Sequence, residues 1–293
     1  MRIIFIGTVE FSRLALAQLV AIGAEVVGVC TLQGSSFNAD YADLRPLCRE
    51  HGIPFKITED INASETLNWI RECSPDVIFC FGWSRLLKEE LLAVAPLGVV
   101  GFHPAALPAN RGRHPLIWAL ALGLEQTAST FFFMDAGADS GDILSQRVIE
   151  IDPADDAGSL YEKVCTAALE QIAQFMPRLA DGSFVREPQN HAQVNTWRKR
   201  GVADGKIDWR MSARSIHNLV RALTKPYVGA HFVIDRKDIK VWKSMVLDNA
   251  PANAEPGKVL GMHHGAPVIK CGQDALCLLV TEPTFSPTEG SYL

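Results

Sequence analysis

One histidine and one aspartate, His103 and Asp139, are the side chains of this sequence best suited to proton transfer. Histidine ionises near neutral pH and can accept a proton from an attacking nucleophile. A nearby carboxylate can orient the imidazole and stabilise its charged form. A histidine before a proline, or an aspartate between glycines, is more often structural. The two residues can therefore act together only if the fold brings their stretches of chain together.

The neighbouring residues predict that each of the two lies at the end of a strand. An apolar run precedes His103, and Pro104 stops the strand because it lacks an amide hydrogen and disfavours helix at the residue before it. The aromatic run Thr130–Met134 predicts a second strand. Asp139 lies in the glycine-bounded loop 135–142 that follows, so both residues can face an open cleft.

The same two stretches resemble the signature of the formyltransferase family that uses formyltetrahydrofolate. Residues 103–112 read HPAALPANRG and residues 139–144 read DSGDIL. The family pattern is close to N-x-H-P-S-x-L-P-x-x-R-G followed by D-x-G-x-I. The resemblance covers nearly the whole chain. It implies a Rossmann-like catalytic domain, His103 as the base, Asp139 as its partner, formyltetrahydrofolate as formyl donor and no metal.

A departure from that pattern bears on the catalytic chemistry. Gly101 stands two residues before the histidine, where the family has an asparagine whose side chain helps to stabilise an oxyanion. Addition of an amine to a formyl group places negative charge on its oxygen, which needs a preorganised donor. Asn110, a main-chain amide, protonated His103 or a water are the alternatives for that donor.

Alternation of strands and helices predicts an α/β fold with a doubly wound, mostly parallel sheet. We expect strands at 2–6, 25–31, 54–57 and 76–81, and helices at 11–20, 40–51 and 64–72. Ligands of such sheets lie beyond the carboxyl ends of the strands. Four loops are therefore expected at one edge: 7–11, 82–87, 101–113 and 135–142. The first, GTVEF, lacks the spacing of a dinucleotide fingerprint, so NAD is not expected.

The resemblance implies that two of these loops bind the pterin ring of the folate through main-chain groups. The residues concerned are Trp83, Ser84, Arg85, Leu86, Leu87, Gly137 and Ala138. A purely structural role, in which Trp83 caps the core, is equally consistent with the sequence.

The second half of the chain predicts a change of fold class. A strand at 145–151 and an amphipathic helix at 159–179 come first, and residues 197–209 resemble the family's connection between two domains. A helix at 212–223 and short β-rich runs then predict a small, open-barrel-like β domain. We expect a catalytic domain at 1–180, a linker at 181–210 and a C-terminal domain at 211–293.

The composition is that of an ordinary globular protein of 293 residues with a net charge of −5. Seven cysteines without a CxxC pair argue against a disulfide framework and a zinc site. There is no apolar run of membrane-spanning length, and the start MRIIFIG lacks the features of a signal peptide. We expect a cytoplasmic protein with no membrane partner, and the sequence is compatible with a homodimer.

The resemblance includes two acceptor classes, initiator methionyl-tRNA and nucleotide-linked amino sugars. The tRNA enzymes of the family carry a basic loop after the second strand, whereas residues 30–44 here contain two aspartates, and the nearest basic residue is Arg45. With the acidic net charge, this argues against a nucleic-acid partner. We therefore expect a 3-amino or 4-amino sugar nucleotide as acceptor. Candidates for its nucleotide, equally explained as a solvated surface, are Arg111, Arg113, Trp197, Arg198 and Lys199.

Two further alternatives remain open from the sequence. The glycine at position 101 could mark a folate-binding protein without catalysis, against which the presence of both His103 and Asp139 speaks. A hydrolase could instead pass the formyl group to water.

Overall fold

A seven-stranded sheet forms the centre of the N-terminal part of the chain. The computed structural model describes residues 1–34 and 40–293. The strand order is β3-β2-β1-β4-β5-β7-β8. The strands from β3 to β5 run parallel, and β7 is antiparallel to β5, so the predicted doubly wound, mostly parallel sheet is confirmed. The strands are β1 (Arg2–Ile6), β2 (Glu25–Thr31), β3 (Phe55–Ile57), β4 (Val77–Cys80), β5 (Val99–His103), β7 (Gln126–Phe133) and β8 (Ile143–Glu150).

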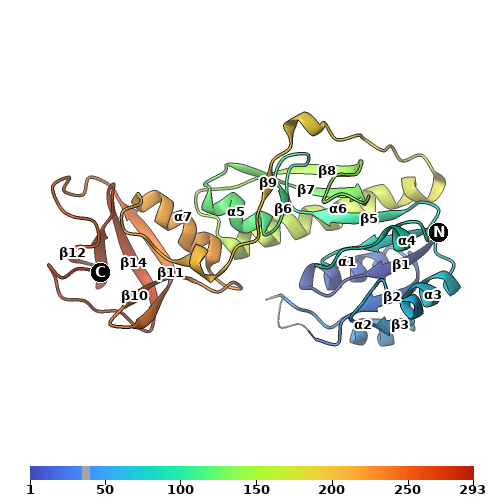
Figure 1. Cartoon of the computed structure of the whole chain (residues 1–293), viewed down its shortest axis with the longest axis horizontal. Coiled ribbons are helices and arrows are strands. Elements are labelled where there is room, and N and C mark those ends of the chain that lie inside the picture. Colours follow the sequence, from blue (N-terminus) through green and yellow to red (C-terminus); the bar gives the residue numbers. More distant parts are fainter. Residues whose placement is uncertain (35–39) are drawn as a thin grey trace. The chain divides into compact units, whose positions relative to one another are not determined.

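Helices connect the parallel strands, as Figure 1 shows. Every residue of β4 and all but the first of β1 are buried, as expected for central strands that are covered on both faces. The helices are α1 (Glu10–Ala21), α2 (Arg45–Glu50), α3 (Ser64–Glu72), α4 (Glu89–Leu92) and α6 (Ala157–Asp181).

The helix predicted at 40–51 is wrong in its first half. Helix α2 begins only at Arg45, with Pro46 in its first turn. Tyr41 instead forms an antiparallel bridge with Val9, and the Glu10 amide donates to the Asp40 carbonyl at 2.8 Å. This pairing with a distant part of the chain outweighs local helix propensity. Residues 35–39, which belong to the loop that we expected to be basic in tRNA enzymes, lie outside the described residues.

Aromatic rings from the end of β4, from β7 and from helix α6 pack together in the core next to β5. Phe79 stacks on Phe81 with ring centroids 5.2 Å apart, and Phe131 packs edge-on against both Phe81 and Phe175. All four rings are fully buried. Such rigid packing on both sides of β5 fixes the strand end that carries His103.

The segment that we expected to be a linker, 181–210, is divided between two compact units. Unit 1 comprises residues 1–112, 128–149 and 162–197, and unit 2 comprises 113–127, 150–161 and 198–293. Up to Trp197 the segment belongs to unit 1, because β9 (Thr196–Trp197) pairs in parallel with β6 (Arg111–Gly112). Because the two paired segments are far apart in the sequence, their hydrogen bonds leave no local sequence pattern from which β9 could be predicted.

Unit 2 contains a five-stranded antiparallel sheet with helix α7 against it (Figure 1). Its order is β10-β11-β14-β13-β12, and the described strands β10 and β12 do not pair with each other, so the sheet is open. Ser212 caps α7 by accepting the Ser215 amide at 3.1 Å. The elements are α5 (Pro115–Ala121), η2 (Val202–Gly205), α7 (Ala213–Leu223), β10 (Ala230–Ile234), β11 (Lys237–Leu247), β12 (Val259–His263), β13 (Ala266–Lys270) and β14 (Ala275–Glu282).

Candidate active site

His103 is the last residue of β5 and is buried, with 5% of its surface exposed. Its backbone is in register with Thr130 of β7, so pairing with this neighbouring strand holds it. The ring Nε2 lies 2.9 Å from the main-chain oxygen of Asn110. A carbonyl oxygen only accepts, so Nε2 carries the hydrogen of this bond. In the neutral imidazole, Nδ1 is therefore the atom that can take up a proton.

Asp139 lies beside that atom. Its Oδ2 is 3.7 Å from Nδ1 of His103 and accepts the amide hydrogen of Gly112 at 2.9 Å. At 3.7 Å the carboxylate is too distant for a hydrogen bond to the neutral ring but close enough to stabilise an imidazolium. The structure thus brings the two predicted residues together. It differs from the expected triad in one respect, because the Asn110 carbonyl, not the carboxylate, supplies the bond that orients the ring.

Met134 and Phe132 occupy the space next to Gly101. A Cβ atom built on Gly101 would lie 2.9 Å from Cγ and 3.1 Å from Sδ of Met134, and 3.1 Å from Cε1 of Phe132. The region where a side chain at position 101 would begin is therefore filled by neighbouring residues. Met134 was not predicted as a neighbour of Gly101, because only the pairing of β7 with β5 brings the two residues together.

Gly101→Asn alone is expected to destabilise the protein by about 1–3 kcal/mol, as overpacked sites do. Adding Met134→Ala should recover part of that loss, because the asparagine can fill the vacated space, so the two changes should not be additive. Urea unfolding of the single and double variants measures this. Gly201→Asn is the control, since a Cβ there meets nothing within 4 Å. A Gly101→Asn protein as stable as the wild type would contradict the expectation.

Asn110 adopts a left-handed backbone conformation, with φ at 63°. Its carbonyl binds His103, and its amide donates to Oδ1 of Asn195 at 2.8 Å. Among the described residues, no hydrogen-bond partner is found for its side-chain amide. That amide is therefore available as an oxyanion donor.

The loop 82–87, one of the two predicted to bind the pterin ring, is held in place by residues outside it. Asn62 donates to the carbonyl of Leu86 at 2.9 Å and accepts the amide of Lys88 at 2.8 Å. Arg85 forms a 2.8 Å ion pair with Glu59. These contacts give the loop a defined shape before any ligand binds.

The side chains of this loop fall into two groups. Leu87 is 3% exposed and belongs to the core, whereas Leu86 is 72% exposed. Trp83 packs against the core, as its structural interpretation predicts, but its Nε1 is buried and finds no acceptor among the described residues. A buried donor of this kind fits a polar ligand atom. In the other loop, the Gly137 amide donates to Asp135 at 2.9 Å, and Ala138 is exposed.

Arg111 does not present its guanidinium to solvent. It is 7% exposed, donates to Oε1 of Gln189 at 2.5 Å and lies 3.3 Å from Nδ1 of His191. This environment favours a structural role over the phosphate ligand that we expected. Trp197 lies in β9, which pairs with Gly112 of β6. Gly112 has a φ of 103°, and a Cβ atom built on it would lie only 2.3 Å from the carbonyl oxygen of Trp197.

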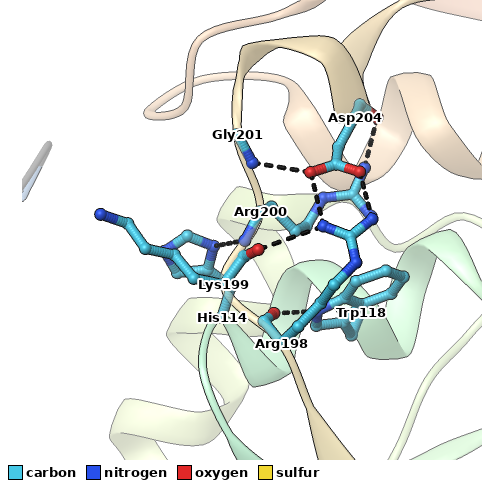
Figure 2. A network of polar contacts seen from close by, with 7 residues as sticks. All are labelled: His114, Trp118, Arg198, Lys199, Arg200, Gly201 and Asp204. Carbon is cyan, nitrogen blue, oxygen red and sulfur yellow. Dashed lines mark hydrogen bonds and ion pairs between the residues drawn. The ribbon is translucent and has the colours of Figure 1, made fainter.

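The other predicted nucleotide ligands belong to a polar network in unit 2 (Figure 2). Arg198 forms an ion pair with Asp204 through both guanidinium ends and holds the pKa of that carboxyl well below its usual range. Arg200 lies 4.5 Å from the ring centroid of Trp118. Lys199 extends away from the Arg198–Asp204 pair in Figure 2. The guanidinium of Arg198 is thus paired with a carboxylate of the same unit, and the positions of Arg113 and Lys199 as phosphate ligands stay a prediction.

His114 belongs to the same network and accepts the amide of Arg200 at 3.4 Å. Burial lowers the pKa of its imidazole, and the neighbouring charges of Arg113, Lys199 and Arg200 lower it further. The ring is therefore neutral near pH 7, and the positive charge of the cluster comes from its arginines and Lys199.

The described parts of the chain contain neither a cluster suited to a metal ion nor a helix of membrane-spanning character. Among residues 1–34 and 40–293 there is no group of three or more metal-ligating side chains. The helices in those ranges are all too short or too polar to cross a membrane. The seven cysteines are free thiols, and six of them are buried.

Comparisons with known proteins agree with these features. A family model described as formyl transferase matches residues 1–176, and one described as formyl transferase, C-terminal domain, matches residues 201–286. A methionyl-tRNA formyltransferase of Caldanaerobacter subterraneus subsp. tengcongensis is 32% identical over 95% of this chain and 91% of its own.

Two solved structures share the fold at low identity. HypX from Aquifex aeolicus, in complex with tetrahydrofolic acid, has a TM-score of 0.69 at 18% identity over 96% of this chain and 44% of its own. The chain thus spans less than half of HypX. An N-formyltransferase from Helicobacter canadensis, in complex with folinic acid and dTDP-3-aminofucose, has a TM-score of 0.69 at 16% identity, over 94% of this chain and 98% of its own.

Proposed function

Because the chain belongs to the formyl transferase family, we propose that it transfers a formyl group from formyltetrahydrofolate to the amino group of a nucleotide-linked amino sugar. The observation that carries the catalytic part is the convergence of His103 Nδ1 and Asp139 Oδ2 at the end of β5. The choice of acceptor rests on the charge of the chain.

His103 acts as the base in this proposal. An attacking amine must lose a proton, and Nδ1 is the ring atom free to take it because Nε2 already donates to Asn110. The resulting imidazolium faces the carboxylate of Asp139, which the Gly112 amide holds in place. The imidazolium is thus stabilised by a group that is present before the reaction begins. Once the amine nitrogen is bonded to the formyl carbon, the bond from that carbon to the folate nitrogen breaks, and the imidazolium returns its proton to the leaving nitrogen.

The formyl oxygen requires a second group. Gly101 has no side chain to offer, and its surroundings are filled by Met134 and Phe132. We assign the role to the side-chain amide of Asn110, since its main chain already binds His103 and its side chain has no partner among the described residues. The protein thereby supplies an amide from the other end of the same loop.

Formyltetrahydrofolate supplies the formyl group, and the loop after β4 is proposed to hold it. Trp83 offers a buried Nε1 donor without an acceptor among the described residues, and Leu86 offers an exposed apolar surface. The contacts of Asn62 and Glu59 keep this loop in place.

The acceptor is proposed to be small because the features expected of a tRNA site are weak. Arg45, the basic residue nearest the loop after β2, donates to both carboxylate oxygens of Asp43 at 2.7 Å. A guanidinium neutralised in this way contributes little to binding a polyanion. Arg113 and Lys199 are proposed to bind the diphosphate of the sugar nucleotide.

A second candidate function is formylation of initiator methionyl-tRNA. It is favoured by the methionyl-tRNA formyltransferases that are 32% and 33% identical over nearly the whole chain. Against it stand the net charge of −5 and the paired Arg45.

One assay separates these functions. Purified protein with formyltetrahydrofolate is expected to produce a formamide only when a dTDP-linked or UDP-linked 3-amino or 4-amino sugar is added. Formylation of methionyl-tRNA under the same conditions would replace the proposal with the second candidate. Steady formate release without acceptor would identify a hydrolase, and donor binding without turnover on any acceptor a non-catalytic relative.

A further inference from the structure

A polar segment at the C-terminal end of unit 1 forms hydrogen bonds with the loop after His103 and with the chain around the Asp139 loop. This bridging segment, residues 187–197, pairs with Ile143 through Glu187, with main-chain hydrogen bonds of 2.8 and 2.9 Å in the two directions. At its other end, Asn195 accepts the amides of Asn110 and Arg111, at 2.8 and 3.1 Å. It therefore contacts the chain just after the Asp139 loop and the chain just after His103.

Gln189 lies within the bridging segment and bonds to both loops with one side chain. Its Oε1 accepts from Nη2 of Arg111 at 2.5 Å. Its Nε2 donates to the carbonyl oxygens of Asp139 and Gly141, at 3.0 and 2.7 Å. Both amide hydrogens and the oxygen are therefore used, and the side chain is 6% exposed. Only a group that donates and accepts can make this set of contacts.

We infer that Gln189 is a positioning residue for catalysis, which sets the distance between His103 and the carboxylate of Asp139. No direct hydrogen bond joins those two side chains, whose nearest nitrogen and oxygen atoms are 3.7 Å apart. Two of the described contacts bear directly on their separation, the Gly112 amide on Asp139 and the side-chain amide of Gln189 on the Asp139 and Gly141 carbonyls. Misplacement of a catalytic group by about 1 Å can cost about 10²-fold in rate.

One substitution can remove the hydrogen bonds from Gln189 to the Asp139 loop while it keeps the contact with Arg111. Gln189→Glu has nearly the same shape and would pair with the Arg111 guanidinium. It would also place a carboxylate oxygen against two carbonyl oxygens, at Asp139 and Gly141, and push the loop away. Gln189→Met retains the size but removes all three hydrogen bonds without adding charge.

A matched control is available in the same unit. Gln171 of α6 is 1% exposed, and its Nε2 donates to Oγ of Ser145 at 2.9 Å and to the Ser129 carbonyl at 3.3 Å. Neither of these two hydrogen bonds reaches the loop that follows His103 or the loop that carries Asp139. Gln171→Glu therefore tests what a charge in a buried glutamine site does by itself.

The first readout is independent of the acceptor. The Gly112 amide hydrogen, which donates to Asp139, should exchange with solvent at least about tenfold faster in Gln189→Glu and Gln189→Met, because local opening becomes easier. Hydrogen exchange measured by NMR on the full chain tests this at a temperature where each variant is folded. Unchanged exchange in both variants, or equal acceleration in Gln171→Glu, would overturn the inference.

The second readout is turnover, and it rests on the proposed function for its acceptor. Gln189→Glu is expected to lower kcat by about 10- to 100-fold with KM for the donor within about threefold, whereas Gln171→Glu leaves both near wild type. In an Asp139→Asn background the same change should cost less than about threefold, because the two act on one contact. Additive losses would overturn the inference. If no acceptor supports turnover in the wild type, the proposed function fails while the exchange measurement still decides the role of Gln189.

Discussion

His103→Asn is expected to lower kcat by about 10³-fold, within the range that a lost general base costs, while leaving donor binding nearly unchanged. The asparagine amide can still donate to the Asn110 carbonyl, but it cannot take up a proton at neutral pH. Steady-state kinetics at saturating donor and acceptor measure the first effect. Calorimetric titration with the folate measures the second.

His217→Asn is the matched control for this prediction. That histidine lies on α7 in unit 2 and bonds to Oγ of Ser244 at 3.0 Å, and it has no role in the proposed mechanism. Its replacement should leave kcat near the wild-type value. If His103→Asn retained more than about a tenth of wild-type turnover, the imidazole would not be the base.

Asp139→Asn is expected to lower kcat by about 10²-fold, less than the loss of His103 itself. The amide has nearly the same shape, so the contact with the Gly112 amide can persist through its oxygen, but the negative charge that stabilises the imidazolium is gone. Asp139→Ala should behave similarly. The measurement is kcat with donor and acceptor both saturating, combined with a thermal melt to show that the variant is folded.

Asp142→Asn tests whether a negative charge elsewhere in the loop 135–142 contributes to turnover as the charge of Asp139 does. It removes a carboxylate from the same loop, and neither an ion pair nor a side-chain hydrogen bond of Asp142 is found among the described residues. We expect turnover within about twofold of the wild type. An Asp139→Asn enzyme as active as this control would refute the role of Asp139 in stabilising charge.

Much of the fold was predictable because its signals are local. The buried runs that form β1 and β2 have no competing helical pattern, and α3 has the predicted bounds, with a start favoured by the nearby asparagine and serine. The helix predicted at 40–51 failed because residues 40–42 pair with the loop after β1. Pairing between segments so far apart has no signature within either segment.

The same distinction explains what could be foreseen at the site. His103 and Asp139 were predicted because each is embedded in a motif of adjacent residues, and the structure brings them together. Arg111 looked like a phosphate ligand because its sequence shows a charge but not the burial or the glutamine that accepts from it. Gln189 was missed for the opposite reason, since a lone glutamine in a polar stretch is typical of a loop.

The bridging segment also bears on where this protein can be cut into working parts. The catalytic-domain boundary that we predicted, at residue 180, and the end of the first family match, at 176, both precede Glu187. A truncated enzyme designed at either position would lose Gln189, Asn195 and the whole of β9. A minimal fragment for engineering, or for grafting onto another acceptor domain, therefore has to run at least to Trp197.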